Sequence, residues 1–343
     1  MINGMRYGGM ELQLVEIIHI IMDKGYTAYL GVLNKKGPMA DALESYLAQP
    51  VHYLDRRKVR IPHTMFKWAK LIKTTKAELV YVQDSFSTFY AIPVSKLLRV
   101  KLINGSIRHA GVSHGFEYFW EKLLLQMSDA VVSNSKAGLE YYGVKGKVVY
   151  NLLDRERFRT STAPLNKIVM NANFSDYKDH LTLLIAGRML IREGIVTQIG
   201  LIGDGKHRLF YEKLCQRLGI SEQVVFHGQV HNVEDLLLDY GIGILCSTKR
   251  YKEGISNSIL EYMGSGLIAI GSNVGAVPEI IKDGYNGFLF EPEDHHSLYE
   301  KICRVISKEA DLDSIRNNAY DTLDMQFNPQ TNCAKLIEIF QSV

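Results

Sequence analysis

Short apolar runs alternate along the chain with longer segments whose apolar residues recur at the spacing of a helix. In the front half, Leu12, Val15 and Ile18 lie on one face of a helix predicted over 10–24. Strands are predicted at 28–33, 51–54, 78–83, 100–104, 130–133 and 147–151, and helices at 38–48, 62–76, 86–98, 116–127 and 136–142. This β–α alternation predicts an α/β fold with a parallel, doubly wound sheet.

A polar stretch without apolar periodicity, residues 154–167, interrupts the alternation, which then starts again. We interpret this stretch as an interdomain linker. Beyond it, strands are predicted at 168–171, 198–202, 224–227, 242–246 and 267–271, and helices at 179–192, 206–218 and 233–240. The tail, 294–343, predicts two or three helices that Pro329 interrupts. We expect an N-terminal domain over 1–160, a C-terminal domain over 161–325 and a last helical segment over 326–343.

Length and composition agree with this organisation. The 343 residues suit two domains of about 150 residues each. Four scattered cysteines, Cys215, Cys246, Cys303 and Cys333, have no paired spacing, so we expect reduced thiols and a cytoplasmic location. No apolar run approaches ~18 residues, and the start, MINGMRYGGM, lacks the pattern of a signal peptide.

The net charge of +3 hides an asymmetry between the two halves. Residues 1–165 hold 23 Lys and Arg against 14 Asp and Glu, whereas the remainder is acidic. Against the single acid Asp55, the stretch 56–76 carries eight cations, interspersed with Phe66, Trp68, Ala69 and Ile72: Arg56, Arg57, Lys58, Arg60, Lys67, Lys70, Lys73 and Lys76. Two interpretations stay open, a solvated helix face and a peripheral patch on the anionic inner face of the cell membrane. No recognised nucleic-acid-binding motif is present, and we expect no nucleic-acid partner.

The segment 242–291 combines groups that suit a phosphorylated sugar. A polar loop carries Glu253, and Glu261 lies about two turns inside the helix that follows. The first residues of that helix, 255–258, offer free amides and the positive end of a dipole to a phosphate. Each glutamate alone is equally compatible with a solvated surface position, but the ordered set favours a binding site.

This order of residues resembles the signature of glycosyltransferase family 4, the glycosyl transferases of group 1. Here the signature reads Glu253, seven residues, Glu261, a small-residue strand after Gly266, and a glycine loop that ends in Pro278 and Glu279. The resemblance implies that the first glutamate contacts the donor sugar and the second the ribose. It implies that backbone amides hold the diphosphate, those of Gly254, Ile255, Ser256, Asn257 and Ser258.

The resemblance also implies the GT-B fold, in which two Rossmann-like doubly wound domains face a cleft. The last helix, residues 331–340, is then expected to cross back to the first domain. Gly8 and Gly9, before the first helix, would let the backbone approach the donor or the acceptor. Since only residues 1–5 remain for the preceding strand, either the chain start is truncated or that strand is very short.

Further positions take roles from the same resemblance. Lys178 fits a cation that neutralises the diphosphate, whereas Asn173 stands where the family has arginine. Gly203 belongs to a strand-to-helix turn near the nucleotide, and Gly228 to a loop that lines the base. His109 is our first choice for a histidine near the reacting sugar and His114 the second, with a surface position as the alternative for each. Arg108 is a candidate phosphate ligand.

The resemblance therefore implies a retaining glycosyltransferase that uses a UDP or GDP sugar as its donor. The acceptor would be a lipid-linked or growing surface glycan, and Glu253, His109 and Lys178 would act at the reacting centre. A sugar-nucleotide epimerase and a non-catalytic binder are the alternatives. Asp311-Leu312-Asp313 spells the Asp-x-Asp of metal-dependent transferases, but its place in the helical tail predicts a helix start. No His/Cys cluster has the spacing of a zinc site either, so we expect no metal. We expect no cofactor, because the nucleotide sugar is a substrate.

Overall fold

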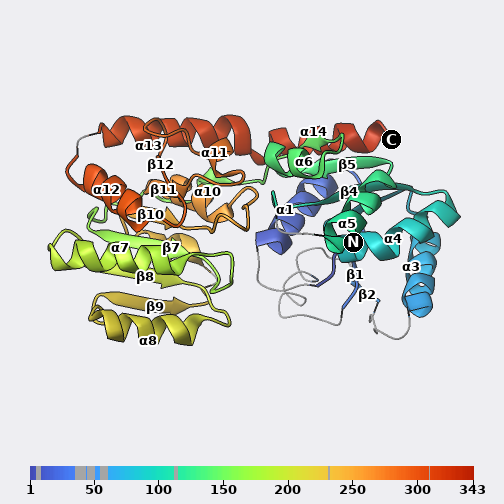
Figure 1. Ribbon diagram of the computed structural model, residues 1–343. Coiled ribbons are helices and arrows are strands. Elements are labelled where there is room, and N and C mark those ends of the chain that lie inside the picture. Colours follow the sequence, from blue (N-terminus) through green and yellow to red (C-terminus); the bar gives the residue numbers. More distant parts are fainter. Residues whose placement is uncertain are drawn as a thin grey trace. The chain divides into compact units, whose positions relative to one another are not determined.

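All strand pairs among the described residues are parallel, as the predicted α/β class requires. The computed structural model describes residues 1–4, 9–34, 44, 51–54, 61–111, 115–230, 232–308 and 310–343. The chain divides into unit 1, Met1–Leu152 with Pro329–Val343, and unit 2, Leu153–Asn328 (Figure 1).

Unit 1 contains a two-stranded sheet and a four-stranded sheet in the order β3-β4-β5-β6. Its strands are β1 (Gly31–Val32), β2 (His52–Tyr53), β3 (Leu79–Val82), β4 (Lys101–Ile107), β5 (Ala130–Ser133) and β6 (Lys147–Val148). Its helices are α1 (Gly9–Asp23), α3 (Ile61–Thr75), α4 (Ser85–Leu98), α5 (Phe116–Gln126), α6 (Lys136–Tyr142) and α14 (Pro329–Gln341).

Helices cover both faces of the four-stranded sheet. Leu102 and Ile103 are neighbours in β4, so their side chains point to opposite faces. Leu102 belongs to a core that includes Trp68 of α3 and residues of α4. Ile103 packs in a second core with Ile17 of α1 and Leu336 of α14. The last helix therefore belongs to unit 1, as expected for residues 331–340.

The first residues of the chain lie between the two sheets of unit 1. Ile2 forms a parallel bridge with Val32 of β1, and the carbonyl oxygen of Met1 accepts a hydrogen bond from Gln83 N at 3.3 Å. The paired part of this start is thus a single bridge, and β1 is shorter than the predicted strand at 28–33. Apart from Glu44, the predicted helix at 38–48 lies outside the described residues.

Unit 2 is a six-stranded sheet in the order β12-β11-β10-β7-β8-β9. Its strands are β7 (Lys167–Asn171), β8 (Gln198–Ile202), β9 (Val224–Gly228), β10 (Ile242–Leu245), β11 (Ile268–Ser272) and β12 (Phe288–Phe290). Its helices are α7 (His180–Arg192), α8 (Arg208–Leu218), α9 (Val233–Leu237), α10 (Asn257–Gly264), α11 (Val277–Ile280), α12 (His295–Ile306) and α13 (Leu312–Thr322), with a 3-10 turn at Arg155–Arg157 and a π turn at Leu323–Phe327.

Both faces of this sheet are buried, which explains why its strands are continuous apolar runs in the sequence. Ile199 and Gly200 are neighbours in β8 and point to opposite sides. A Cβ at Gly187 of α7 would overlap Ile199, and a Cβ at Gly200 would overlap the ring of Tyr240. Gly187 therefore lets α7 approach one face of the sheet closely, and Gly200 lets Tyr240 approach the other face.

The polar stretch 154–167, which we interpret as the interdomain linker, is part of unit 2 and is hydrogen-bonded to it. Ser161 Oγ donates to the carbonyl oxygens of Leu238 and Tyr240 at 2.9 and 2.7 Å, and Ser161 N donates to Ser265 O at 2.8 Å. The unit boundary falls at Leu152, before the predicted 160. Hydrogen bonds attach this stretch to unit 2. A pattern of apolar residues cannot predict such bonds.

Candidate functional site

The ends of β7 and β10 are neighbours at the centre of the unit 2 sheet. From β7 the chain continues outward through β8 to β9, and from β10 it continues in the opposite direction through β11 to β12. The strand order therefore reverses between β7 and β10, the place where open α/β sheets bind their ligands. The loops after these two strands carry Lys178 and Glu253.

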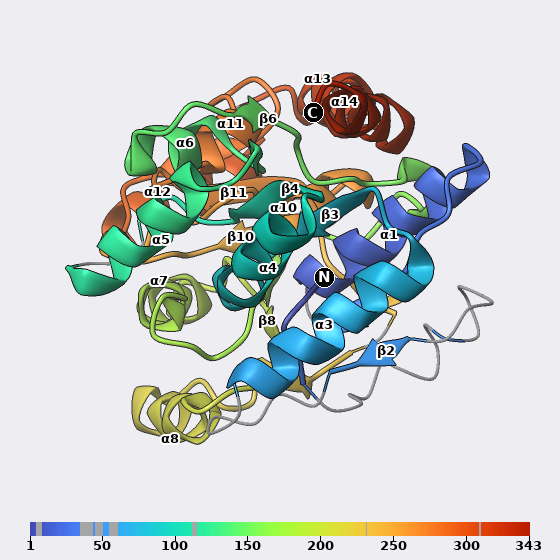
Figure 2. The ribbon, with the colours of Figure 1, turned by 90° about the vertical axis from the view of Figure 1, so that its right-hand side faces the viewer.

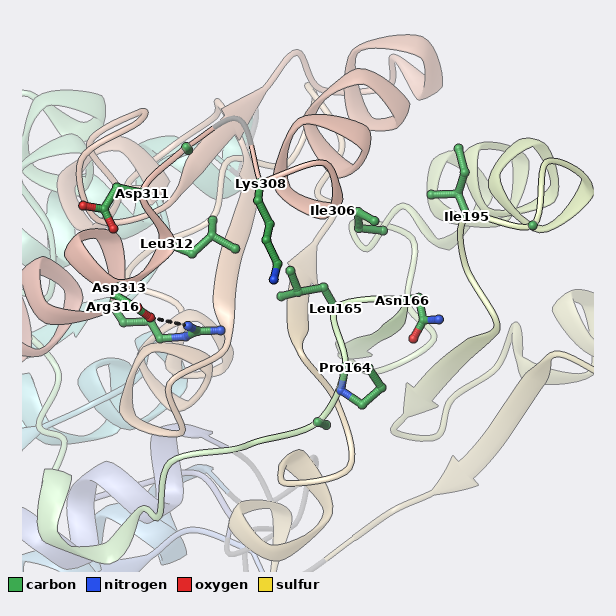
Figure 3. Close-up of a pocket in the computed structure, with 13 residues that line it drawn as sticks. Pro164, Leu165, Asn166, Ile195, Ile306, Lys308, Asp311, Leu312, Asp313 and Arg316 are labelled. Atoms are coloured by element: carbon green, nitrogen blue, oxygen red, sulfur yellow. Dashed lines mark hydrogen bonds and ion pairs between the residues drawn. The ribbon is translucent and has the colours of Figure 1, made fainter.

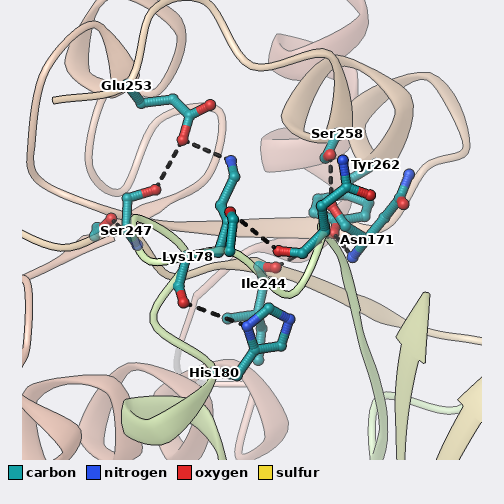
Figure 4. A network of polar contacts seen from close by, with 11 residues as sticks. Asn171, Lys178, His180, Ile244, Ser247, Glu253, Ser258 and Tyr262 are labelled. Atoms are coloured by element: carbon teal, nitrogen blue, oxygen red, sulfur yellow. Dashed lines mark hydrogen bonds and ion pairs between the residues drawn. The ribbon is translucent and has the colours of Figure 1, made fainter. Parts of the chain in front are cut away.

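Glu253 accepts hydrogen bonds from two side chains of these loops (Figure 4). Lys178 Nζ lies 2.6 Å from Glu253 Oε2, and Ser247 Oγ donates to the same oxygen at 2.9 Å. The two charged side chains are largely withdrawn from solvent, with 9% of Lys178 and 17% of Glu253 exposed. Both bonds reach the same carboxylate oxygen, Oε2 (Figure 4).

The main chain holds the loop of Lys178 against the end of β10. Lys178 forms an antiparallel bridge with Ser247, and Asp179 N donates to Cys246 O at 3.0 Å. The Asp179 side chain also caps α7, where it accepts from Thr182 N at 3.1 Å. Backbone contacts therefore fix the position of Lys178 in addition to the bond between its ammonium group and Glu253.

The backbone of Glu253 lies against the loop that follows β11. Ala276 N donates to Glu253 O at 2.9 Å. Gly275 has φ +62°, and a Cβ on it would overlap the Glu253 carbonyl oxygen and lie 2.6 Å from the Glu253 nitrogen. Glycine is thus needed here for its left-handed backbone and for the close contact.

A Gly275→Ala variant should lower the free energy of unfolding by about 3 kcal/mol or more, because backbone strain and a backbone overlap add together. Gly284→Ala is the matched control: its φ is +74°, but a Cβ there has nothing within 4 Å. The control should lose about 1 kcal/mol. Chemical denaturation compares the two. Equal losses would show that Gly275 does not support Glu253.

Glu261 lies on α10, beside Asn171 at the end of β7. Asn171 Nδ2 donates to Glu261 Oε2 at 2.8 Å. Two more side chains of α10 bind the Asn171 main chain, since Ser258 Oγ donates to its oxygen at 2.6 Å and Tyr262 OH accepts from its nitrogen at 2.6 Å (Figure 4). Three side chains of α10 therefore bind a single residue of β7.

Burial raises the pKa of Glu261 from 4.5 to about 7; nearby Glu234 adds to this shift and the Asn171 bond opposes it. Below pH 4.5 Glu261 is protonated in folded and unfolded chains and contributes nothing. Above that pH the unfolded chain releases its proton first, so the folded state loses stability until about pH 7. A shift of this size is worth about 3 kcal/mol.

We therefore expect Glu261→Gln to raise the melting temperature at pH 8 and to leave it unchanged at pH 4. Gln can still accept the hydrogen bond of Asn171, so the change tests charge alone. Glu300→Gln, on the exposed side of α12, is the control and should show no such dependence. Melting curves across this pH range test the prediction. A change in melting temperature that is the same at every pH would contradict a raised pKa of Glu261.

Glycines bring the loops after β7, β8 and β9 together. Gly203 N donates to Gly228 O at 2.7 Å. A Cβ on Gly203, at φ +127°, would overlap Ala172 O, and a Cβ on Gly205, at φ +155°, would lie 2.6 Å from Phe174 O. The predicted turn at Gly203 is a strand-to-helix connection, but α8 begins at Arg208 and not at residue 206.

The helix that carries Glu261 begins later than predicted. α10 starts at Asn257 with Ser256 as its N-cap residue, so Glu261 lies about one turn inside the helix and not two. Gly254, Ile255 and Ser256 are buried. In this helix the Ser256 side chain makes no capping bond.

The arginine position of the resemblance, Asn173, is exposed. Two other basic side chains of these loops are bound to an acid, since Lys206 Nζ and His207 Nε2 lie 2.5 and 2.6 Å from the Asp176 carboxylate. The Lys206 and His207 bonds lower the pKa of Asp176. Lys178 is thus the cation that the structure places beside Glu253.

The candidate histidine of unit 1 follows β4. The His109 ring packs against Tyr142 with centroids 6.2 Å apart, and burial lowers its pKa. Within the described part of the chain, its Nδ1 has no hydrogen-bond partner. Arg108, our candidate phosphate ligand, donates to Gly105 O at 3.1 Å and to Tyr81 OH at 3.4 Å. These bonds give Arg108 a structural role within unit 1.

Within unit 2 the structure thus brings Lys178 to Glu253 and Asn171 to Glu261. Gly9 is the first residue of α1, while Gly8 and His114 lie outside the described residues. Sequence reasoning missed Asn171 and Ser247, which bind the two glutamates. Each is a polar residue at or just after the end of an apolar strand, and that position is the signal that points to them.

A hollow of about 740 Å³ lies elsewhere in unit 2 (Figure 3). It is lined by Pro164, Leu165 and Asn166, just before β7, and by Lys308 and Arg316. Residues 164–166 directly precede β7, whereas Lys178 follows it, so the hollow lies at the opposite end of this strand from the site.

The acidic pair in the helical tail is a helix start, as predicted. Asp311 is the N-cap residue of α13 and accepts from Ser314 N at 3.1 Å. Over the described residues, no three His, Cys, Asp or Glu side chains are grouped to hold a metal ion. In the same part of the chain, none of the helices combines the length and apolarity of a membrane span.

The chain is similar to known proteins in sequence and in fold. Residues 154–322 match the family model described as glycosyl transferases group 1. The chain is 26% identical over 208 residues to N-acetyl-alpha-D-glucosaminyl L-malate synthase of Bacillus anthracis, which covers 57% of this chain and 54% of that protein. It is 21% identical to lipopolysaccharide core biosynthesis mannosyltransferase LpsB of Rhizobium meliloti (strain 1021), over 74% of this chain and 76% of that one. The chain spans about half the length of the first of these curated relatives.

A solved structure shares the whole fold. Anabaena Alr3699/HepE, in complex with UDP and glucose, superposes with a TM-score of 0.87 at 21% identity, over 99% of this chain and 98% of that one. This likeness identifies the fold as GT-B, with two Rossmann-like domains that correspond to units 1 and 2.

Proposed function

Because residues 154–322 belong to the glycosyl transferases of group 1, we propose that this chain transfers a sugar from a nucleotide diphosphate to an acceptor, with retention at the anomeric carbon. The observation that carries the proposal is the pairing of Glu253 with Lys178, and of Glu261 with Asn171, at the reversal of strand order in unit 2. Open α/β sheets bind nucleotides at such a reversal.

The two glutamates would bind two different sugars of the donor, the transferred sugar and the ribose. The free oxygen of Glu253 would accept a hydrogen bond from a hydroxyl of the transferred sugar. Glu261 would accept from the ribose hydroxyls, and these bonds favour its charged form, so binding near pH 7 should release a proton. The α10 N-terminus and Lys178 would hold the diphosphate, because the helix end and the ammonium group both favour negative charge.

In the proposed step, the bond between the anomeric carbon and the diphosphate oxygen breaks as the acceptor oxygen bonds to that carbon on the same face. The acceptor proton passes to the departing diphosphate. Lys178, 9% exposed, would stabilise the charge that develops on this leaving group. The step needs no protein nucleophile, metal or cofactor, and the donor would be a UDP or GDP sugar.

Relatives support a glycan acceptor. The mannosyltransferase LpsB acts in lipopolysaccharide core biosynthesis, as its name states. By analogy, the acceptor here would be a lipid-linked or growing surface glycan bound by unit 1, with His109 near the reacting sugar.

The test has two stages. A panel of UDP and GDP sugars is first screened by thermal shift, because a ligand of the folded state raises the melting temperature. The donor that binds is then incubated with lipid-linked glycan acceptors and the products are analysed by mass spectrometry. A glycosylated acceptor with retained configuration is expected. Epimerised free donor without transfer would show an epimerase, and binding without any product would show a non-catalytic binder.

A further inference from the structure

One side of unit 1 exposes apolar side chains that a folded domain would normally bury. On α4, Phe86, Phe89 and Leu97 have 58%, 42% and 80% of their surface exposed, and Pro93 between them is exposed as well. These positions recur at helical spacing, so they form one stripe. The opposite side of α4 fills the core with residues such as Tyr90.

The neighbouring helix α5 has a second such stripe. Phe116, Phe119 and Trp120 are 75%, 59% and 43% exposed, and the Phe116 and Trp120 rings stack edge to face at 5.7 Å. Leu125 is the buried residue of α5. The outer face of this eleven-residue helix is therefore apolar and exposed.

The helix on the other side of α4 is basic. α3 has no acidic residue, and Lys70, Lys73 and the following Lys76 are exposed. Our sequence-based membrane patch over 56–76 relies on aromatic anchors, and of these Trp68 is buried in the core whereas Phe66 is 68% exposed. Residues 56–60 of that patch lie outside the described residues. The larger group of exposed apolar side chains is therefore on α4 and α5, and the exposed lysines are on α3 together with Phe66.

The three helices share one side of unit 1. α3 and α4 pack on the same face of the four-stranded sheet and α5 lies beside α4, so their outer surfaces point away from that sheet together (Figure 2). We define the aromatic patch as Phe86, Phe89, Leu97, Phe116, Phe119 and Trp120. Of the two glutamates of α5, Glu121 is bound inward by Ser85 and Tyr142, at 2.8 and 2.6 Å, while Glu117 is exposed.

We propose that the aromatic patch inserts into the headgroup region of an anionic lipid bilayer, with the lysines of α3 on the lipid phosphates. Aromatic rings favour the membrane interface, and contiguous exposed apolar surface marks a docking site. Each lysine near an anionic surface contributes about 1 kcal/mol. A second copy of the chain is disfavoured, because a symmetric contact would bring two basic α3 helices together. This partner adds to the proposed function and does not depend on it.

The test is flotation of the purified chain with vesicles of phosphatidylcholine alone or mixed with phosphatidylglycerol. Binding is expected to the anionic vesicles and to weaken as salt is added. Phe116→Ser with Trp120→Ser should abolish it, and each of Lys70→Gln and Lys73→Gln should weaken it about fivefold. Leu97→Ser changes the most exposed of these side chains and tests the part of the patch on α4 independently of α5.

The controls come from unit 2. Phe210, on α8, is 57% exposed, close to the value of Phe119, and Lys213 on the same helix is exposed. Phe210→Ser and Lys213→Gln should float like the unchanged chain. The proposal is overturned if the patch variants float as the unchanged chain does, if no anionic vesicle binds, or if the patch variants instead abolish a concentration-dependent dimer. Because flotation uses no sugar donor, its outcome is separate from that of the transfer assay.

Discussion

A Glu253→Gln variant is expected to lose about 10²–10³-fold in kcat while it still binds the nucleotide. One carboxylate oxygen, Oε2, is occupied by Lys178 and Ser247 (Figure 4), and we expect a sugar hydroxyl to donate to the other. Gln keeps the size of the side chain and loses its charge. Since the lost interaction is with the transferred sugar, the Kd for UDP should change by no more than about threefold.

The matched control for this change is Glu291→Gln, an exposed glutamate of unit 2 outside the site. It should leave both kcat and Kd unchanged. Transfer assays with saturating donor give kcat, and isothermal titration with UDP gives Kd. Unchanged turnover in Glu253→Gln would remove Glu253 from the reacting centre.

A Lys178→Met variant is expected to lose both stability and transfer. Without the ammonium group, the carboxylate of Glu253, 17% exposed, remains partly buried and unpaired. Breaking a buried ion pair from one side lowers the free energy of unfolding by about 3 kcal/mol. Transfer should fall at least as far as in Glu253→Gln, because the charge on the leaving diphosphate loses its cation.

The double variant Lys178→Met with Glu253→Gln separates the two effects. It should recover most of the lost stability, since no unpaired charge remains, and recover none of the transfer. Both tryptophans, Trp68 and Trp120, lie in unit 1, so unfolding of unit 2 should be followed by far-ultraviolet circular dichroism. A double variant as unstable as Lys178→Met alone would show that the pair is not what stabilises these loops.

The fold was predictable where burial on both faces makes a strand a continuous apolar run. β10 and β11 are buried throughout, and the sequence placed both within one residue of their observed bounds. The same reasoning failed at residues 154–167, because hydrogen bonds such as those of Ser161 hold that stretch in unit 2. It also failed for Trp68, since an amphipathic helix pattern does not say which aromatic ring faces the core.

The candidate site was predictable in its charged residues and not in their partners. Glu253, Glu261 and Lys178 stand in a recognisable order along the chain. Asn171 and Ser247 gain their roles from the neighbouring ends of β7 and β10, which are far apart in the sequence. The pairing of Lys178 with Glu253 also depends on the antiparallel bridge between two loops, and no local pattern contains it.

The central claim is that the loops at the ends of β7 and β10 hold the nucleotide diphosphate, and hydrogen exchange with and without UDP, and in parallel GDP, tests it most directly. A bound ligand slows exchange of the amides that it contacts or orders. We predict protection at residues 172–180 and 252–260 and none at 310–313, which line the hollow of Figure 3. Protection at 310–313 without any at 172–180 and 252–260 would contradict the account.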